Sequence, residues 1–283
     1  MGKSLLLTGS DGFTGQHFSS AARVRNYEVY DLSSNLVNGG DVAEELKNRH
    51  FDQVVHLAAI AAVTHKHEAE LYDVNLFGTL NLLDALARQA TPPQKILLAS
   101  SANVYGNAIK KQICEATEAA PVNHYAMSKL AAEYLARNYQ DKLPIITLRP
   151  FNYTGRGQDE RFVIPKLIRH FKARAAEIEL GNVSVKREFN DVRSVCEIYL
   201  NLLEQGQAGA TYNICSGTTY CLSEITRLLS VLTGHEIDIK VNPAFVRKNE
   251  VHELCGDPAK LLKCLGTIKY HPLEKTLQWM LAE

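Results

Sequence analysis

The segment Ser4-Leu-Leu-Leu-Thr-Gly-Ser-Asp-Gly-Phe-Thr-Gly15 joins a short apolar run to three regularly spaced glycines. The apolar run predicts a first strand, and the pattern after it predicts a helix from about Phe13. Gly9 permits the tight turn between them, Gly12 lets a ligand approach the backbone, and Gly15 lets strand and helix pack closely. Because amides at a helix start bind phosphates, this segment predicts a site for the pyrophosphate of a dinucleotide.

The second predicted strand, residues 28–30, ends at Asp31, a position that usually meets the adenosine ribose of such a cofactor. A carboxylate there repels a 2′-phosphate, which favours NAD. Arg23 and Arg25 are near in sequence, so NADP stays open. Asp41-Val42 is a candidate pair for the adenine, and a solvated helix cap is the alternative for Asp41.

Strand and helix patterns continue to alternate through the first half of the chain. The predicted strands are residues 53–57, 95–100 and 145–148, and the predicted helices are residues 68–88 and 125–139. This alternation is typical of a parallel sheet covered on both faces. We therefore expect an α/β protein with a Rossmann-type doubly wound parallel sheet, whose NAD(P)-binding domain covers residues 1–150.

The pattern becomes irregular after Pro150. Helices are predicted at residues 162–171, 192–203, 222–232 and 273–281, and short strands at 212–214 and 236–241. These elements predict a smaller C-terminal α/β lobe for the substrate over residues 151–283. Whether it shares strands and helices with the first domain stays open.

Composition excludes several classes of function. The 31 basic and 31 acidic residues balance, and no basic block suggests nucleic acid or an anionic membrane as a partner. No apolar run is long enough for a membrane span or a signal peptide. The six cysteines are scattered without a CxxC pair, which favours free thiols in the cytoplasm and no metal site.

Tyr125-Ala-Met-Ser-Lys129 places a phenol and an amine one turn apart on one face of a predicted helix. Tyrosine normally ionises near pH ~10, and the lysine ammonium is expected to lower the pKa of Tyr125. Ser101, at the end of an earlier strand, can hydrogen-bond an alcohol or carbonyl oxygen. These residues predict proton transfer beside a hydride carrier. The alternative is a structural pair on an amphipathic helix.

Further motifs follow these in a characteristic order. They are Gly9-x-x-Gly12-x-x-Gly15, His56-Leu57-Ala58-Ala59, Asn75, Ser100-Ser-Ala-Asn-Val-Tyr-Gly106, Tyr125-x-x-x-Lys129 and Arg149-Pro-Phe-Asn152. With them the chain resembles the extended short-chain dehydrogenase/reductases that act on nucleotide sugars. The resemblance implies catalytic roles for Ser101, Tyr125 and Lys129. The cofactor-binding residues expected for NAD(H) or NADP(H) are Gly9, Asp11, Gly12, Phe13, Thr14, Gly15, Asp31, Asp41, Val42, Leu57, Ala58, Ala59, Tyr125 and Lys129.

The residues after Ser101 help to choose a reaction. Dehydratases of this family carry an Asp-Glu or Ser-Glu pair there, whose carboxylate takes a proton during elimination. This chain has Ala102-Asn103, and asparagine is not a base. The sequence therefore favours simple hydride transfer at carbon 4 of the sugar.

The C-terminal half carries matches to one subgroup. The segments Arg187-Glu-Phe-Asn-Asp-Val-Arg193 and Arg247-Lys-Asn-Glu250 resemble the GDP-4-keto-6-deoxy-D-mannose reductases. The resemblance implies NAD(P)H-dependent reduction of the 4-keto group of GDP-4-keto-6-deoxy-D-mannose to GDP-D-rhamnose, with UDP or dTDP as alternative nucleotides. The substrate-binding residues that it implies are Ser101, Asn103, Asn152, Arg187, Arg247 and Glu250; a surface salt bridge is the alternative for each charged one.

Two other functions remain open. A nucleotide-sugar 4-epimerase would use the same catalytic residues but retain its NAD, and a non-catalytic NADP-sensing regulator would not need them. Apolar residues on the helices at 70–88 and 125–139 suggest an exposed apolar face, for which the family resemblance implies a homodimer through those helices. Packing against the chain's own lobe would explain the same pattern. His124 is a proton relay or a helix-start residue. His65 and His67 are expected in a solvated loop and not at a metal.

Overall fold

The computed structural model describes residues 2–61, 67–108, 112–245 and 252–282. Its centre is a six-stranded sheet in the order β10-β5-β4-β3-β1-β2, and every neighbouring pair in it is parallel. The strands are β1 (Ser4–Thr8), β2 (Glu28–Asp31), β3 (Gln53–His56), β4 (Lys95–Ala99), β5 (Ile145–Pro150) and β10 (Thr211–Ile214).

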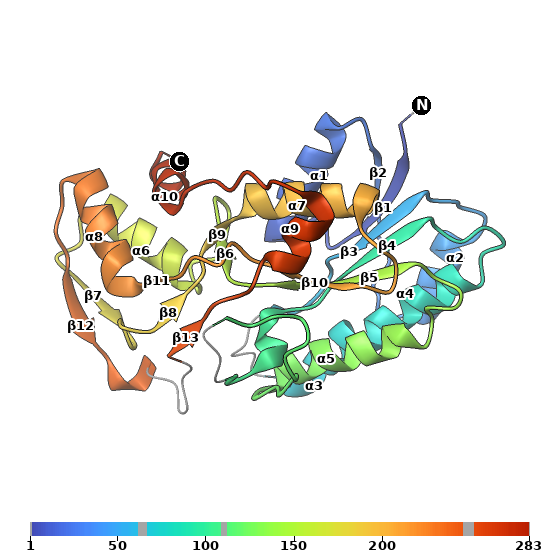
Figure 1. Ribbon diagram of the computed structural model, residues 1–283, viewed down its shortest axis with the longest axis horizontal. Coiled ribbons are helices and arrows are strands. Elements are labelled where there is room, and N and C mark those ends of the chain that lie inside the picture. Colours follow the sequence, from blue (N-terminus) through green and yellow to red (C-terminus); the bar gives the residue numbers. More distant parts are fainter. Residues whose placement is uncertain (1, 62–66, 109–111, 246–251, 283) are drawn as a thin grey trace.

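Helices cover both faces of this sheet (Figure 1). On one face lie α1 (Phe13–Val24) and α7 (Val192–Gln205), and on the other α2 (Gly39–Leu46), α3 (Glu68–Tyr72), the π-helix η1 (Asp73–Phe77), α4 (Gly78–Ala87) and α5 (His124–Arg137). Side chains alternate along β1, so Leu5 and Leu7 join the apolar cluster of Phe18, whereas Leu6 joins that of Leu82. The predicted doubly wound fold is confirmed.

A second apolar cluster forms beyond the sheet. It is built from α6 (Val163–Lys172), β7 (Glu177–Leu180), α8 (Leu222–Thr233), β12 (Asp238–Val241) and α10 (Leu273–Leu281). The shorter elements are β6 (Tyr153–Thr154), β8 (Lys186–Arg187), β9 (Asn190–Asp191), β11 (Tyr220–Cys221), β13 (Glu253–Leu254), α9 (Ala259–Leu265), and the 3₁₀ turns η2 (Ala102–Tyr105) and η3 (Pro243–Phe245). Of these, α9 packs against the core of the large sheet.

The chain crosses between the two parts more than once. After β5 it enters the outer cluster, returns with α7 and β10 to complete the large sheet, and then leaves again (Figure 1). Strand β10 pairs with β5, so Tyr212 lies opposite Leu148. Residues on both sides of position 150 therefore belong to one sheet. The division into two domains at residue 150 remains a prediction.

A buried ion pair ties α5 to the sheet. The guanidinium of Arg149 donates from Nε to Oε1 of Glu133 at 2.9 Å and from Nη2 to Oε2 at 2.6 Å. The Ser100 hydroxyl donates to the same carboxylate at 2.5 Å, and the guanidinium lies 4.8 Å from the centre of the Tyr105 ring. Glu133 is 2 % exposed and Arg149 5 %, so neither charge can turn to water if the other is lost.

Replacing Arg149 by methionine should lower the free energy of unfolding by about 3–5 kcal/mol, because it leaves a buried carboxylate unpaired. The double variant Glu133→Gln/Arg149→Met removes both charges and should recover part of that loss. Urea unfolding of the two variants measures the difference. Equal stability of Arg149→Met and the wild type would contradict this account of the pair.

Candidate active site

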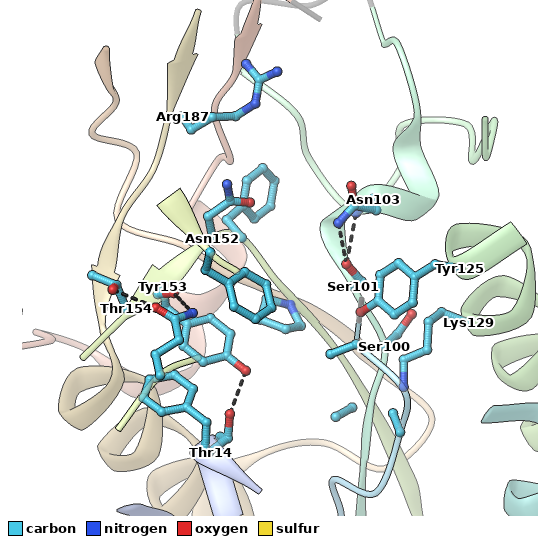
Figure 2. Close-up of a pocket in the computed structure, with 18 of the residues that line it drawn as sticks. Thr14, Ser100, Ser101, Asn103, Tyr125, Lys129, Asn152, Tyr153, Thr154 and Arg187 are labelled. Atoms are coloured by element: carbon cyan, nitrogen blue, oxygen red, sulfur yellow. Dashed lines mark hydrogen bonds between the residues drawn. The ribbon is translucent and has the colours of Figure 1, made fainter. Parts of the chain in front are cut away.

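A cavity of about 590 Å³ opens at the carboxyl ends of the sheet strands, where α/β sheets bind ligands. The glycine-rich turn after β1, the segment after β4 and the segment after β5 all line it. Figure 2 shows Ser101, Asn103, Tyr125 and Lys129 on one side of this space, with Asn152, Tyr153 and Arg187 on the other.

The glycine-rich turn permits no larger residue at two positions. Gly9 has φ +71°, and a Cβ there would lie 2.7 Å from the Ala58 backbone. A Cβ on Gly15 would lie 2.0 Å from the Gly9 carbonyl oxygen. The turn leads directly into α1, whose first turn contains no acidic side chain, so its amides suit a pyrophosphate.

At the adenosine end, Asp31 stands at the end of β2 beside Arg23, with 3.5 Å between carboxylate and guanidinium. Arg25, the other candidate for a 2′-phosphate, instead binds Glu197 and Asn201 of α7. Arg23 is therefore the arginine still near Asp31.

Asp41 and Val42 lie in the first turn of α2. The Asp41 carboxylate accepts a hydrogen bond from the Asn38 side-chain amide at 2.7 Å. The N-cap of α2 is Asn38 itself, without a side-chain cap hydrogen bond, so Asp41 is not the cap residue. Val42 is fully buried in the sheet core, so only its backbone can face a ligand. The sequence did not predict α2 itself.

The cavity includes part of the predicted cofactor set. Gly9, Gly12, Phe13, Thr14, Gly15, Leu57, Ala59, Tyr125 and Lys129 line it. Asp11, Asp31, Asp41, Val42 and Ala58 lie outside that lining. The cofactor-binding roles of these five residues therefore remain predictions.

Ser101, Tyr125 and Lys129 meet at the cavity wall and are all nearly buried. Contrary to expectation, the pKa of Tyr125 is raised, because burial disfavours the phenolate; hydrogen bonding to Ser101 partly offsets this. Burial also lowers the pKa of Lys129 to about 8, although the negative charge of Glu133 acts to raise it. With a pKa of about 8, Lys129 is mostly protonated at neutral pH.

Two buried polar residues hold the wall behind Lys129. His56 at the end of β3 bonds Thr8 at 2.7 Å and Thr79 at 2.9 Å. Burial, and then Lys129, lower the pKa of His56 to about 3, so this ring is neutral. Asn75 accepts from the Ile60 amide at 2.9 Å and donates to Ser128 at 3.0 Å.

Asn75 belongs to η1, the π-helical turn inside the predicted helix at 68–88. Single π turns of this kind often occur at functional sites. Here the turn brings the Asn75 amide to both the segment after β3 and α5, and thereby joins the cofactor side of the cavity to the catalytic helix.

Of the predicted substrate-binding residues, Asn152 and Arg187 line the side of the cavity opposite Tyr125 (Figure 2). Phe189 also lines the cavity. Glu188, between Arg187 and Phe189, turns away and accepts hydrogen bonds from the amides of Gly256 at 2.8 Å and Ser216 at 2.7 Å. It is 1 % exposed and so fixes which side chains of this segment face the cavity. Arg247 and Glu250 lie outside the described residues.

Sequence reasoning missed several cavity residues. Tyr153 donates to or accepts from Thr14 at 2.8 Å and thereby joins β6 to the glycine-rich turn (Figure 2). Other missed lining residues are Val122, Asn123, Thr154, Gln158, Phe162, Val163, Ile164, Tyr199 and Leu254. Tyr153 could have been identified from its position just after the end of a predicted strand. The apolar residues that line the cavity follow no sequence motif.

The remaining histidine predictions have mixed outcomes. His124 is the first residue of α5, and its ring bonds Tyr72 at 2.9 Å and Glu68 at 3.1 Å, which supports the helix-start reading. His67 precedes α3, whereas His65 lies outside the described residues. Within the described ranges, no cluster of potential metal ligands occurs, and no helix is long and apolar enough to cross a membrane.

The loop after Asp31 should respond to acid. Burial raises the pKa of Glu45, but hydrogen bonds from Ser33, Ser34 and Tyr30 outweigh it and lower that pKa from 4.5 to about 2. The stabilisation is therefore complete above the unfolded-state pKa and is lost as pH falls from about 4.5 toward 2. The urea midpoint of Glu45→Gln should approach that of the wild type as pH falls from about 6 to 3; a constant gap would contradict this assignment.

Cofactor preference should depend on two adjacent side chains. Asp31→Ala should weaken NADH binding about 5- to 10-fold by removing a ribose hydrogen bond, and should spare NADPH. Arg23→Ala should weaken NADPH selectively, because it removes the cation nearest that position. Titration calorimetry with both cofactors measures this, and unchanged affinities in both variants would place the adenosine elsewhere.

The chain matches known proteins over almost its whole length. A family model described as GDP-mannose 4,6 dehydratase matches residues 32–280. GDP-6-deoxy-D-talose 4-dehydrogenase of Aggregatibacter actinomycetemcomitans is 35 % identical, over 93 % of this chain and 91 % of that protein. GDP-6-deoxy-D-mannose reductase of Pseudomonas aeruginosa is 33 % identical, over 100 % of this chain and 97 % of that protein.

Solved structures agree with these sequences. The structure of RMD from Pseudomonas aeruginosa, complexed with NADPH, has a TM-score of 0.91 and 31 % identity, and the match covers 99 % of this chain and 98 % of that one. The cavity beside the glycine-rich turn fits a nicotinamide dinucleotide, because its glycines leave backbone amides open to a pyrophosphate. The chain is an NAD(P)-dependent nucleotide-sugar enzyme and belongs to the GDP-mannose 4,6 dehydratase family.

Proposed function

We propose that this protein reduces the 4-keto group of a GDP-linked 4-keto-6-deoxyhexose with NAD(P)H. The observation that carries the proposal is the meeting of Ser101, Tyr125 and Lys129 in one cavity wall, between the glycine-rich turn and the side of Asn152 and Arg187. The two hydroxyls and the amine can act on a carbonyl group. The planar guanidinium of an arginine can donate paired hydrogen bonds to a diphosphate.

The side chains divide the chemistry among themselves. The bound cofactor supplies a hydride to carbon 4 of the sugar. Tyr125 gives its hydroxyl proton to the oxygen of that carbon, and Lys129 stabilises the phenolate that remains. Ser101 hydrogen-bonds the same oxygen and lowers the cost of its developing charge. Burial of all three strengthens these interactions, because little water competes.

The names of two relatives define the substrate more closely. One acts on GDP-6-deoxy-D-talose as a 4-dehydrogenase, and the other is a GDP-6-deoxy-D-mannose reductase. Talose and mannose differ only at carbon 4, so both names share one 4-keto sugar and differ in the face that receives hydride. We infer GDP-4-keto-6-deoxy-D-mannose as substrate and favour GDP-D-rhamnose, which is GDP-6-deoxy-D-mannose, as product.

The 4-epimerase alternative receives less support. It would need the sugar to turn within the cavity and take the hydride back on the opposite face. Neither of the two relatives above is named as an epimerase. Dehydration is disfavoured by Ala102 and Asn103, since neither side chain can take the proton that elimination releases.

The proposal extends to assembly and location. We infer a homodimer through η1 and α5, where Phe77, Met127 and Tyr134 are 49 %, 46 % and 56 % exposed. Large apolar side chains at one surface favour association. The six free cysteines fit a reducing compartment, in agreement with the expected cytoplasmic location.

Tyr125→Phe tests the chemistry directly. It should lower turnover of GDP-4-keto-6-deoxy-D-mannose by about 100-fold or more, while NAD(P)H affinity stays close to that of the wild type. Absorbance of the reduced nicotinamide measures turnover, and calorimetry measures affinity. Full turnover in this variant would remove Tyr125 from the mechanism, and an inert wild type would point to another substrate.

A further inference from the structure

The Ser101 hydroxyl has an unusual set of partners. Its oxygen accepts a hydrogen bond from the Asn103 backbone amide at 3.1 Å and a second from the Asn103 side-chain amide at 3.0 Å. Both bonds come from one residue in η2, the 3₁₀ turn that Ser101 caps. Figure 2 shows them as the two dashed lines between Asn103 and Ser101.

This arrangement fixes the direction of the remaining hydrogen bond. A hydroxyl has two acceptor lone pairs and one donor proton. Because Asn103 occupies both lone pairs, the Ser101 proton is left for a partner inside the cavity.

A serine hydroxyl that can only donate a hydrogen bond is better suited to binding a ketone than an alcohol. A ketone oxygen has two lone pairs and no proton, so it can accept from Ser101 and Tyr125 together. A serine free to rotate would often accept from Tyr125 instead, and the tyrosine proton would then point away from the substrate. Two aligned donors fit the oxygen at which negative charge develops.

We propose that Asn103 is a positioning residue that holds Ser101 as a hydrogen-bond donor to the substrate carbonyl. This rests on the proposed reduction of a 4-keto sugar and gives Asn103 a role through Ser101 in place of a direct contact with the sugar. In the reaction Ser101 keeps its proton, while the tyrosine proton moves to the carbonyl oxygen and is later replaced from solvent.

Asn103→Asp and Asn103→Ala separate the two contacts. Aspartate has nearly the same shape as asparagine, but its carboxylate accepts hydrogen bonds where the amide donates them. The Ser101 hydroxyl should therefore donate to the aspartate and no longer to the substrate carbonyl. We expect kcat to fall about 10- to 100-fold in Asn103→Asp, and about 3- to 10-fold in Asn103→Ala, which keeps the backbone donor. KM and cofactor affinity should change little.

The decisive test repeats both changes in a Ser101→Ala background. If Asn103 acts through Ser101, neither change should lower kcat more than about twofold there. A further fall by the same factors as in the wild type would show that Asn103 acts independently and would overturn the proposal. Asn182→Asp is a matched control, because its oxygen only accepts, from Ser184 at 3.0 Å and 2.8 Å, and an aspartate can do the same.

A second measurement needs no sugar. Tyrosine labelled with ¹³C at Cζ reports ionisation of Tyr125 in the protein with NAD⁺ bound, with Tyr125→Phe identifying its resonance. The midpoint should rise in Ser101→Ala and Asn103→Asp, with little further rise when both are present. A rise from Asn103→Asp that persists without Ser101 would be an effect of charge alone and would contradict the proposal. This titration stands even if the wild type proves inactive on the proposed sugar.

Discussion

The buried carboxylate of Glu133 is the interaction on which the catalytic wall depends. It lies one helical turn after Lys129 on α5 and binds the Arg149 guanidinium from β5 and the Ser100 hydroxyl after β4. Because buried charges must be paired, this carboxylate fixes α5 against the two strands whose ends carry Ser101 and Asn152. Helix geometry places the phenol of Tyr125 beside the ammonium of Lys129, and this packing brings the serine from a distant part of the sequence to both.

The cavity owes its two sides to the path of the chain. The parallel sheet supplies a glycine-rich turn and the wall of Ser101, Tyr125 and Lys129. The segment after β5 supplies Asn152, β8 supplies Arg187, and α6 supplies part of an apolar wall. Glu188 and the Thr14–Tyr153 hydrogen bond hold the second side to the first. The proposed cofactor and sugar sites therefore share one cavity, as hydride transfer between two bound molecules requires.

Much of this was readable in the sequence, because its strongest signals are local. Alternating runs predicted the parallel sheet and most helices, and the Tyr125–Lys129 spacing predicted a shared helix face. Short elements such as β6 and β8, each of two residues, have no periodicity to read. The partners of Glu133 and Glu188 come from distant parts of the chain, so no local pattern could reveal them. The pKa of Tyr125 was predicted in the wrong direction because burial, which is a tertiary property, outweighs the hydrogen bond to Ser101.

The central claim is that hydride leaves the cofactor and stays on carbon 4 of the sugar. The most direct measurement is turnover of GDP-4-keto-6-deoxy-D-mannose with reduced cofactor carrying deuterium at the transferred position, followed by NMR of the product. The account predicts one deuterium at carbon 4 for each cofactor oxidised, in a GDP-6-deoxyhexose whose configuration identifies the face of transfer. A product formed without net cofactor oxidation, or with deuterium absent from carbon 4, would contradict it.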